Sequence, residues 1–384
     1  MSDQICIDRV QLFALSCEVE CRPNSSLGVM RGRNGLLLAI SDKDGGIGWG
    51  EVWCNFPPRH ALAMALLIED VIAPHLLSQK FTDWSAIRPY LENSLARMIL
   101  HTGQPGSFAH CLAGIDMAAA DLVARRRQIP LHQMLTAQID HNQLISVYAS
   151  SPSGADLESD LATIINDHHS SVKLKIGFGE SRDSKILAIF DQVSKGQLDL
   201  YVDANQAWTL SEAIEATKRL ETWSPVFVEE PLRADADQAD WGKLAQMSRV
   251  EIAAGENIQG DANFGTFIAN KSLGFVQPDV AKWGGISGTL AIALKAQENG
   301  LRYAFHFMGT ALGLAATLQT CAAAGGSGPI ELDANANPLR TELGDIDLSV
   351  RNGCVAVPDG HGLGFIPDAK SLTRFADTQI DIRR

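Results

Sequence analysis

The stretch VKLKIG, residues 172–177, is a short apolar run that carries charged side chains, and the second half of the chain repeats this pattern at nearly constant intervals. Seven such runs end at Lys175, Asp203, Glu229, Glu256, Asp279, His306 and Glu331, which are 28, 26, 27, 23, 27 and 25 residues apart. A strand, a turn, a helix and a second turn need about that many residues, and crossover helices are the usual link between parallel strands. Charged groups at the carboxyl ends of such strands are typical of the active site of a (β/α) barrel. The spacing therefore predicts both a fold and the place of its active site.

Eight parallel strands are predicted, alternating with helices such as 210–223 and 286–299, and no clear helix follows the last strand. The predicted strands are residues 143–149, 172–177, 199–204, 225–230, 251–255, 274–279, 302–306 and 329–333. The predicted fold class is α/β, a modified TIM barrel of the (β/α)7β type.

The residues before the barrel have an α+β pattern. Strands that form an antiparallel meander are predicted at 5–15, 34–41 and 46–53, and helices at 59–77, 84–100 and 107–125. The tail has little periodic pattern, and we expect it to return to this first region. The predicted organisation is an N-terminal α+β capping domain (1–128), a (β/α) barrel domain (129–335) and a C-terminal segment that completes the capping domain (336–384).

The composition is that of a globular protein with an acidic balance, since 384 residues carry a net charge of −13. Nucleic acids need a basic surface, so the charge argues against them as partners. An anionic substrate needs a local positive field, for example from a metal ion. Seven scattered cysteines without a C-x-x-C pair favour a reducing compartment. No signal peptide or membrane span is visible, so we expect a cytoplasmic protein that does not contact a membrane.

Two lysines, Lys173 and Lys175, lie at positions i and i+2 and therefore share one face of their strand. A strand with a solvated face would explain an isolated pair of this kind. Both faces of a parallel barrel strand are normally covered, however, so we expect both lysines to point inward. Adjacent ammonium groups lower each other's pKa, which makes one of them a candidate general base.

Three carboxylates, Asp203, Glu229 and Glu256, end three successive strands. Each alone could be a helix cap or a surface charge, but oxygen ligands that converge from neighbouring strand ends suit a hard cation such as Mg²⁺. Glu230 follows Glu229 directly and is expected to point the other way, so we choose Glu229 as the ligand. Asn205 shares the face of Asp203 and is a candidate to hydrogen-bond a ligand or substrate oxygen.

The next two strands end in Asp279 and His306, so these side chains are expected to be neighbours. A lone barrel histidine could be structural, but a carboxylate partner fixes the tautomer and raises the basicity of a histidine that transfers protons. Glu331 ends the last strand and, if protonated, could donate a hydrogen bond to an oxyanion. The glycine-rich segment 284–288 is better explained as a tight turn than as a phosphate site, and His168-His169 lacks the H-x-H pattern of an amidohydrolase metal site.

These motifs, in this order, resemble the enolase superfamily and, more closely, its mandelate racemase group. The resemblance covers nearly the whole chain. It includes GWGE (residues 48–51), AGIDMAAADL (residues 113–122) and the K-x-K, D-x-N, E-E-P, G-E-N, D-x-x-K-x-G-G and histidine motifs of the barrel. In that family three acids hold an essential Mg²⁺, and a base removes the proton α to a carboxylate to give an enediolate, a use of Lys or His with Mg²⁺ that is general in this superfamily.

The resemblance implies a role for each matching residue. Lys175 is implied as the base on one face of the substrate, Lys173 as the group that assists it and contacts the carboxylate, His306 with Asp279 as the acid/base pair on the opposite face, and Glu331 as the group that hydrogen-bonds the enediolate. Relatives that lactonize muconate carry a lysine at the position of Asp279, so that reaction is disfavoured here.

The leading hypothesis is a Mg²⁺-dependent dehydratase of acid sugars, or a related enzyme acting on a hydroxylated carboxylate. The same groups could run a racemase, epimerase or cycloisomerase, and a non-catalytic binding protein on this scaffold is a third possibility. The resemblance places specificity in two loops of the capping domain, near residues 17–33 and 53–60, where Arg22, Arg31 and Arg33 are candidates to meet a distal carboxylate or hydroxyls. It also implies a homo-oligomer with a small carboxylate substrate.

Overall fold

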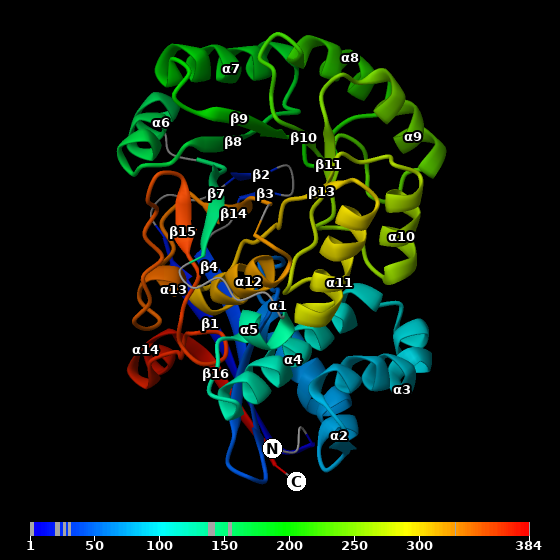
Figure 1. The fold of residues 1–384 in the computed structure, drawn as a ribbon, viewed down its shortest axis with the longest axis vertical. Helices are drawn as coiled ribbons and strands as arrows, with labels where there is room; N and C mark the ends of the chain where they lie inside the picture. Colours follow the sequence, from blue (N-terminus) through cyan, green and yellow to red (C-terminus); the bar gives the residue numbers. More distant parts are fainter. Residues whose placement is uncertain are drawn as a thin grey trace.

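The computed structural model describes residues 4–19, 24–25, 28–29, 32–136, 143–152, 156–326 and 328–383. A barrel of parallel strands, drawn in green to orange, stands above an antiparallel sheet with its own helices, drawn mainly in blue, cyan and red (Figure 1). Both ends of the described chain lie in the antiparallel part, because the first and last strands pair with each other.

The predicted barrel is confirmed within the described residues. Its strands are β7 (Leu144–Ser150), β8 (Ser171–Lys175), β9 (Asp199–Asp203), β10 (Val228–Glu229), β11 (Ile252–Ala254), β12 (Phe275–Val276), β13 (Arg302–Tyr303) and β14 (Ile330–Asp333). They follow one another in parallel, and β14 pairs with β7. A parallel bridge between Phe305 and Ile330 joins the two ends of the sheet, so the barrel is closed.

A helix follows each of the first seven barrel strands, as a (β/α)7β barrel requires. These helices are α6 (Leu157–Asn166), α7 (Glu180–Ser194), α8 (Leu210–Leu220), α9 (Gln238–Met247), α10 (Asp261–Ala269), α11 (Gly285–Glu298) and α12 (Ala311–Ala323). Aromatic rings fill the barrel interior: Tyr148 stacks on Tyr201 at 4.9 Å, and Phe227 contacts Tyr201 and Phe275 at 4.7 and 5.1 Å between ring centroids. The barrel is thus a packed core rather than a pore.

The predicted meander is also confirmed. The sheet has the order β16–β1–β4–β5, formed by β16 (Ala376–Arg383), β1 (Ile5–Glu18), β4 (Gly32–Asp42) and β5 (Ile47–Val52), while β6 (Lys80–Phe81) pairs with β1. A short hairpin joins β2 (Asn24–Ser25) to β3 (Gly28–Val29). The helices are α1 (His60–Leu67), α2 (Ala73–Leu76), α3 (Ile87–Thr102), α4 (Pro105–Arg126) and α5 (Leu131–Leu135).

The predicted helix 59–77 is divided into three pieces. A π-helical turn (Ile68–Ile72) separates α1 from α2, and Pro74 stands in the first turn of α2. Proline has no amide hydrogen and its ring clashes with the preceding turn, so it is tolerated at a helix start and not in an interior. A 3₁₀ turn (Trp84–Ala86) likewise precedes α3.

The tail contacts both parts of the molecule. It contains α13 (Pro338–Thr341), β15 (Cys354–Ala356), α14 (Ala369–Phe375) and β16. β16 pairs antiparallel with β1, which is the return to the first sheet that the sequence predicts. β15 pairs antiparallel with β7 on the barrel, a contact that the weak pattern of the tail did not reveal.

Helix α4 is the central helix of the capping part. It packs against β5 on one side and against α11 of the barrel on the other. It is long and apolar enough to cross a bilayer, but 89% of its most apolar window is buried inside the protein. Its apolar side chains are therefore accounted for by packing in the core.

The contact between β5 and α4 depends on glycines of the GWGE motif. A Cβ atom at Gly48 would overlap the carbonyl oxygen of Ala118, and one at Gly50 would overlap that of Gly114. The backbones approach so closely that no side chain fits between them. This contact fixes the position of the residue that follows, Glu51.

We expect Gly50→Ala to lower the free energy of unfolding by about 1–3 kcal/mol, because the added methyl group forces β5 away from α4. Gly242, inside α9, is the matched control, since a Cβ atom there meets nothing within 4 Å. Gly242→Ala should instead stabilise the protein by about 0.5–1 kcal/mol. Urea unfolding of both variants measures the difference, and equal midpoints would contradict the packing account.

Candidate active site

The structure brings together eight side chains that the sequence singles out, at the carboxyl ends of the barrel strands. This strand-end cluster consists of Lys173, Lys175, Asp203, Glu229, Glu256, Asp279, His306 and Glu331. They meet because the carboxyl ends of all strands in a closed parallel barrel lie on one face.

Lys173 lies in the middle of the cluster and is fully buried. Its Nζ atom is 2.7 Å from Glu229 Oε2 and 2.8 Å from Glu331 Oε1, and it lies above the Tyr148 ring at 5.4 Å. Lys175 Nζ is 2.5 Å from Asp203 Oδ2. Both lysines point inward, as expected from the covered faces of a barrel strand.

The expected lowering of the lysine pKa values is wrong for this arrangement of side chains. Burial does lower the pKa of Lys175, but the charge of Asp203 outweighs burial and the repulsion by Lys173, so the pKa is raised. Burial also lowers the pKa of Lys173, and Glu229 and Glu331 raise it well above its usual range. The prediction considered only the two ammonium groups and omitted the acids beside them.

His306 is held between two carboxylates. Its Nδ1 atom is 2.6 Å from Asp279 Oδ2, and its Nε2 atom is 2.6 Å from Glu256 Oε2. Asp279 and His306 are thus neighbours, as the strand order indicates. Burial lowers the pKa of His306, but the charges of Glu256 and Glu331 and the bond to Asp279 outweigh it and raise the pKa well above its usual range.

Glu331 uses its two oxygens differently. Oε1 accepts hydrogen bonds from Lys173 and from the hydroxyl of Ser150. Oε2 is buried, has no hydrogen-bond partner among the described residues and lies 3.5 Å from His306 Nε2. Attraction to Lys173, His306 and Lys175 lowers the pKa of Glu331 against the effect of burial, which raises it. Glu331 is thus an acceptor here, and not the protonated donor that the sequence suggested as one option.

The three acids chosen as metal ligands lie in a row on β9, β10 and the loop after β11. Each already has a cationic partner: Lys175 contacts Asp203, Lys173 contacts Glu229, and His306 contacts Glu256. Among the described residues, no three His, Cys, Asp or Glu side chains surround a common point at metal-binding distance in this arrangement. Burial, and then repulsion by Asp203, raise the pKa of Glu229 to about 7.

The charge balance of the site still fits a divalent cation. The carboxyl groups of Asp203, Glu229, Glu230, Glu256, Asp279 and Glu331 outnumber the three lysines and one histidine that they face. Burial, and then repulsion by Glu256 and Asp203, accordingly raise the pKa of Glu230 well above its usual range, as burial and Asp203 raise that of Glu229. Uncompensated buried charge is costly. A divalent cation would favour the ionised form of these acids, and converging carboxylate oxygens are the ligands that Mg²⁺ prefers, so the residues present suit that ion.

Several residues of the site were not recognised from the sequence. Glu230 does not point away from the cluster: its backbone has a φ angle of 41°, and both of its oxygens accept from Asn257 Nδ2 at 2.8 and 3.1 Å. Asn257 also donates to Glu256 and accepts from Lys282 at 3.0 Å. The alternation of a strand ends where the backbone turns left-handed, so the geometric reason given for rejecting Glu230 does not hold.

Gln277 and Ser150 are two further polar residues of the site. Gln277 Nε2 donates to Glu229 Oε2 at 2.7 Å, and Ser150, at the end of β7, donates to Glu331. Gln277 stands two residues before Asp279, a spacing that could have revealed it. Ser150 carries no charge, so the pattern of charged strand ends does not include the first strand.

Of the residues predicted to contact a substrate, the structure places one beside the strand-end cluster and another away from it. Asn205 is next to the cluster, and its backbone and side-chain amides donate to Asp203 at 2.7 and 3.2 Å. Arg22 and Arg31 lie outside the described residues. Arg33 does not face a substrate: it is buried and pairs with Asp333 at 2.7 Å.

The segment after β5 brings aromatic side chains of the capping part to the cluster. Lys282 Nζ lies above the Trp53 ring at 4.8 Å, and the Trp53 ring contacts that of His110 at 5.0 Å. The Trp53 amide donates to the Ala281 carbonyl at 3.3 Å. His110 is buried, and its Nδ1 atom has no hydrogen-bond partner among the described residues. Burial, and then repulsion by Lys282 and His60, lower the pKa of His110 to about 3.

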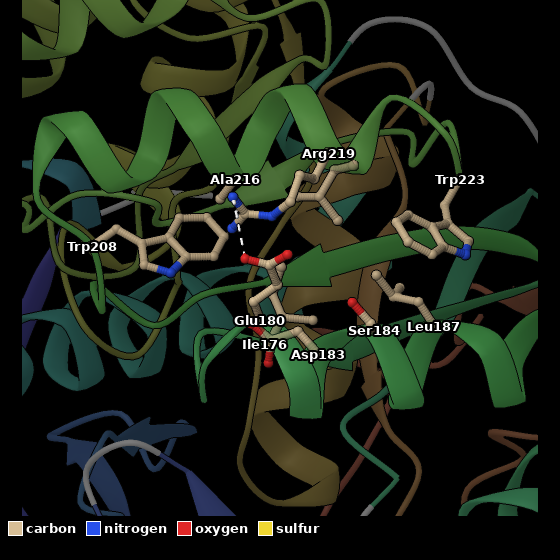
Figure 2. Close-up of a pocket in the computed structure, with 10 residues that line it drawn as sticks. Ile176, Glu180, Asp183, Ser184, Leu187, Trp208, Ala216, Arg219 and Trp223 are labelled. Carbon is tan, nitrogen blue, oxygen red and sulfur yellow. Dashed lines mark ion pairs between the residues drawn. The ribbon is translucent and has the colours of Figure 1, made fainter.

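A cleft between α7 and α8 lies apart from the cluster. Figure 2 shows that Trp208 and Trp223 flank it and that Arg219 on α8 reaches toward Glu180 on α7, 4.0 Å away. Its free volume of about 30 Å³ is the room of one water molecule, and none of the eight cluster residues lines it. It is therefore not the substrate site.

A closed barrel with these acids and bases at its strand ends, next to an α+β capping part, defines an acid–base enzyme of the TIM-barrel class. Residues 11–136 match the model of the mandelate racemase / muconate lactonizing enzyme N-terminal domain, and residues 156–371 match the enolase C-terminal domain-like model. The chain therefore belongs to the enolase superfamily, in its mandelate racemase group, as the motifs indicate.

Individual relatives cover most of the chain. The solved structure of a mandelate racemase/muconate lactonizing enzyme from Bordetella bronchiseptica RB50 is 37% identical, with a TM-score of 0.89 over 97% of this chain and 99% of that one. D-galactarolactone cycloisomerase of Agrobacterium fabrum is 28% identical over 88% of this chain and 90% of its own. Arabinonate dehydratase of Saccharolobus solfataricus is 26% identical over 86% of this chain and 87% of its own.

We expect His110 to make the fold acid-sensitive. Its pKa is about 3 when folded and about 6.5 when unfolded, so the unfolded state takes up the proton first. The resulting stability is complete above pH 6.5 and is lost as the pH falls below it. When the pH falls from 7 to 5, the free energy of unfolding should decrease by about 2 kcal/mol more in the parent than in His110→Gln. Urea unfolding at both pH values tests this, and equal losses would refute it.

Proposed function

We propose that this protein is a Mg²⁺-dependent enzyme that removes the proton α to the carboxylate of a hydroxy acid, with dehydration of an acid sugar to a 2-keto acid as its reaction. One observation carries the proposal. Lys175 contacts the first acid of the row, Asp203, while His306 contacts the last, Glu256. A substrate bound against this row therefore has a proton-transfer group on each side.

Asp203, Glu229 and Glu256 are the proposed ligands of Mg²⁺. When bound there, the ion would supply the positive charge that stabilises a carboxylate substrate and the second negative charge that forms beside it. A racemase of the same fold from Streptomyces coelicolor, 23% identical with a TM-score of 0.84, has been solved with bound magnesium.

Lys175 is the proposed base. It must be neutral to accept a proton, whereas its pair with Asp203 raises its pKa. If Asp203 shares its charge with a divalent cation, the attraction that raises the pKa weakens, and the repulsion by Lys173 acts in the other direction. Metal binding and activation of the base are therefore linked through Asp203.

The other cluster residues complete the proposed reaction. Lys173 binds the substrate carboxylate, and the unpartnered Oε2 of Glu331 is the atom available to a substrate hydroxyl or acidic enediol. His306, oriented by Asp279, delivers a proton to the leaving β-hydroxyl, so that water departs. Asn205 holds Asp203 and is proposed as a further substrate contact, and Arg22 as a contact from the capping part.

The second candidate is a racemase, epimerase or cycloisomerase that uses the same groups. The similarity to D-galactarolactone cycloisomerase favours it, whereas the similarity to arabinonate dehydratase favours dehydration. Both relatives act on sugar-derived acids by name, which supports a small hydroxylated carboxylate as the substrate class. A homo-oligomer and a cytoplasmic location complete the proposal; the described cysteines are all free, as in a reducing compartment.

Incubation with a panel of sugar acids in D₂O distinguishes the two reactions. A 2-keto acid product supports dehydration, and deuterium at Cα without loss of water supports racemisation or epimerisation. His306→Asn should abolish dehydration, because the leaving hydroxyl loses its proton donor, while Lys175 should still exchange the α-proton. Full turnover by this variant would remove His306 from the mechanism.

Loss of any proposed ligand should weaken Mg²⁺ binding. We expect at least about a tenfold rise in the Kd for Mg²⁺ in Asp203→Asn, Glu229→Gln and Glu256→Gln, measured by calorimetry. Asp199→Asn is the matched control, because this exposed aspartate begins β9, the strand that Asp203 ends. Unchanged affinity in all three variants would refute the ligand assignment. If EDTA also changed neither stability nor α-proton exchange, a non-catalytic binding protein would be favoured.

A further inference from the structure

The members of the strand-end cluster differ in how firmly the barrel holds them. Lys173, Lys175, Asp203, Glu229 and Glu331 lie within regular strands. Asp279 and His306 each come three residues after the end of β12 or β13. Side chains on loops are placed less accurately than those on strands unless other residues support them. The Asp279–His306 pair therefore needs support from outside the barrel strands.

One buried carboxylate of the capping part supports the loop that follows His306. Glu51, at the end of β5, is only 3% exposed. Its oxygens accept from the amide and hydroxyl of Thr310 at 2.9 and 2.6 Å and from the amide of Gly313 at 2.8 Å. These donors form the first turn of α12, which begins only five residues after His306.

Two glycines leave room for this carboxylate. A Cβ atom at Gly309 or at Gly313 would overlap both an oxygen of Glu51 and the Phe307 ring. A glycine inside a helix costs about 1 kcal/mol relative to alanine, so Gly313 is explained by the close approach of Glu51.

A second buried carboxylate supports the loop that follows Asp279. Asp116, on α4, is fully buried and accepts from the amide and hydroxyl of Ser287 at 2.9 and 2.7 Å. Ser287 lies in the first turn of α11, and a Cβ atom at Gly285 would overlap Asp116. The two contacts are equivalent: each joins the capping part to the helix that follows one member of the pair.

We propose that Glu51 and Asp116 are positioning residues, through which the capping part sets the Asp279–His306 pair for proton transfer. This inference rests on the proposed function. It assigns a task to the GWGE and AGIDMAAADL motifs, which lie outside the barrel. The Lys175 side of the site, held by strand β8, does not depend on these contacts.

The test compares Glu51→Gln and Asp116→Asn with the parent. Each substitution replaces one accepting carboxylate oxygen with an NH₂ group, so at least one of the N–H or O–H groups that donate to the acid loses its acceptor and the contact is weakened. We expect dehydration to fall about 10²-fold, because a misplacement of about 1 Å costs that much. The α-proton exchange driven by Lys175 and the KM should change by less than about threefold. Equal losses of dehydration and exchange would indicate a merely structural role and overturn the proposal.

Asp121→Asn is the matched control. Asp121 is also a fully buried acid of α4, but it accepts from the amides of Trp49 and Leu363 and from Arg125, away from the pair. Asp121→Asn should lower the stability of the protein, and any change in the rate of dehydration should be matched by the rate of α-proton exchange. Thr310→Val and Ser287→Ala remove the hydroxyl donors of the same two contacts from the barrel side. They replace Glu51→Gln or Asp116→Asn in the test if either of those variants does not fold. If Asp121→Asn also lost dehydration while keeping α-proton exchange, to the same extent as Glu51→Gln, the proposal would be overturned.

Two readouts do not require a substrate. Amide hydrogen exchange of Thr310 and Gly313 in Glu51→Gln, and of Ser287 in Asp116→Asn, should be at least about tenfold faster than in the parent. The His306 ring resonances should also shift in both variants and not in Asp121→Asn. If the parent converts no acid in the panel, the proposed function fails, while these readouts still decide the positioning role. Unchanged protection and resonances would refute it.

Discussion

Burial of negative charge at one end of the barrel is the constraint on which the site depends. Carboxylates of low exposure converge there from successive strands, and an isolated buried carboxylate is far too costly to persist. The structure compensates by placing a cationic group against each acid of the row, with Lys173 shared between Glu229 and Glu331. Burial, and then repulsion by Asp203, nevertheless raise the pKa of Glu229 to about 7, so a further cation would stabilise the row. The proposed metal preference and the proposed activation of Lys175 thus follow from one electrostatic requirement.

The charged strand ends could be predicted because their meeting point is dictated by topology. Parallel strands with right-handed crossovers have only one arrangement of their carboxyl ends, so the regular spacing of Lys175, Asp203, Glu229 and their successors was enough to bring them together. The adjacency of Asp279 and His306 follows from the same rule. Neither result required knowledge of any side-chain conformation.

Other features of the site depend on backbone conformation and on contacts between distant segments, which the spacing of residues along the sequence does not reveal. Glu230 enters the site because its backbone turns left-handed at the strand end, which breaks the alternation assumed for a strand. The raised pKa values of the lysines depend on distances to acids from other strands. Arg33 is a candidate for substrate contact by its place in the sequence, but Asp333, 300 residues further along the chain, holds it in the interior. Each of these outcomes is set by a contact between segments far apart in sequence, and one sequence gives no register for such contacts.

The division between strand and loop explains how one proton abstraction can lead to different products. On the proposed roles, Lys175 and the metal ligands up to Glu229 are fixed by strands and by ion pairs within the barrel, so the first step is the same whatever the capping part does. Asp279 and His306 lie beyond their strands, and their loops are bonded to Asp116 and Glu51 of the capping part. That part also carries Trp53 against Lys282, whose Nζ atom lies 3.6 Å from Glu256 Oε2. On these proposed roles, changes in the capping part alter the fate of the second proton without disturbing the barrel. This is the arrangement expected of a group whose members include both a dehydratase and a cycloisomerase at 26–28% identity to this chain.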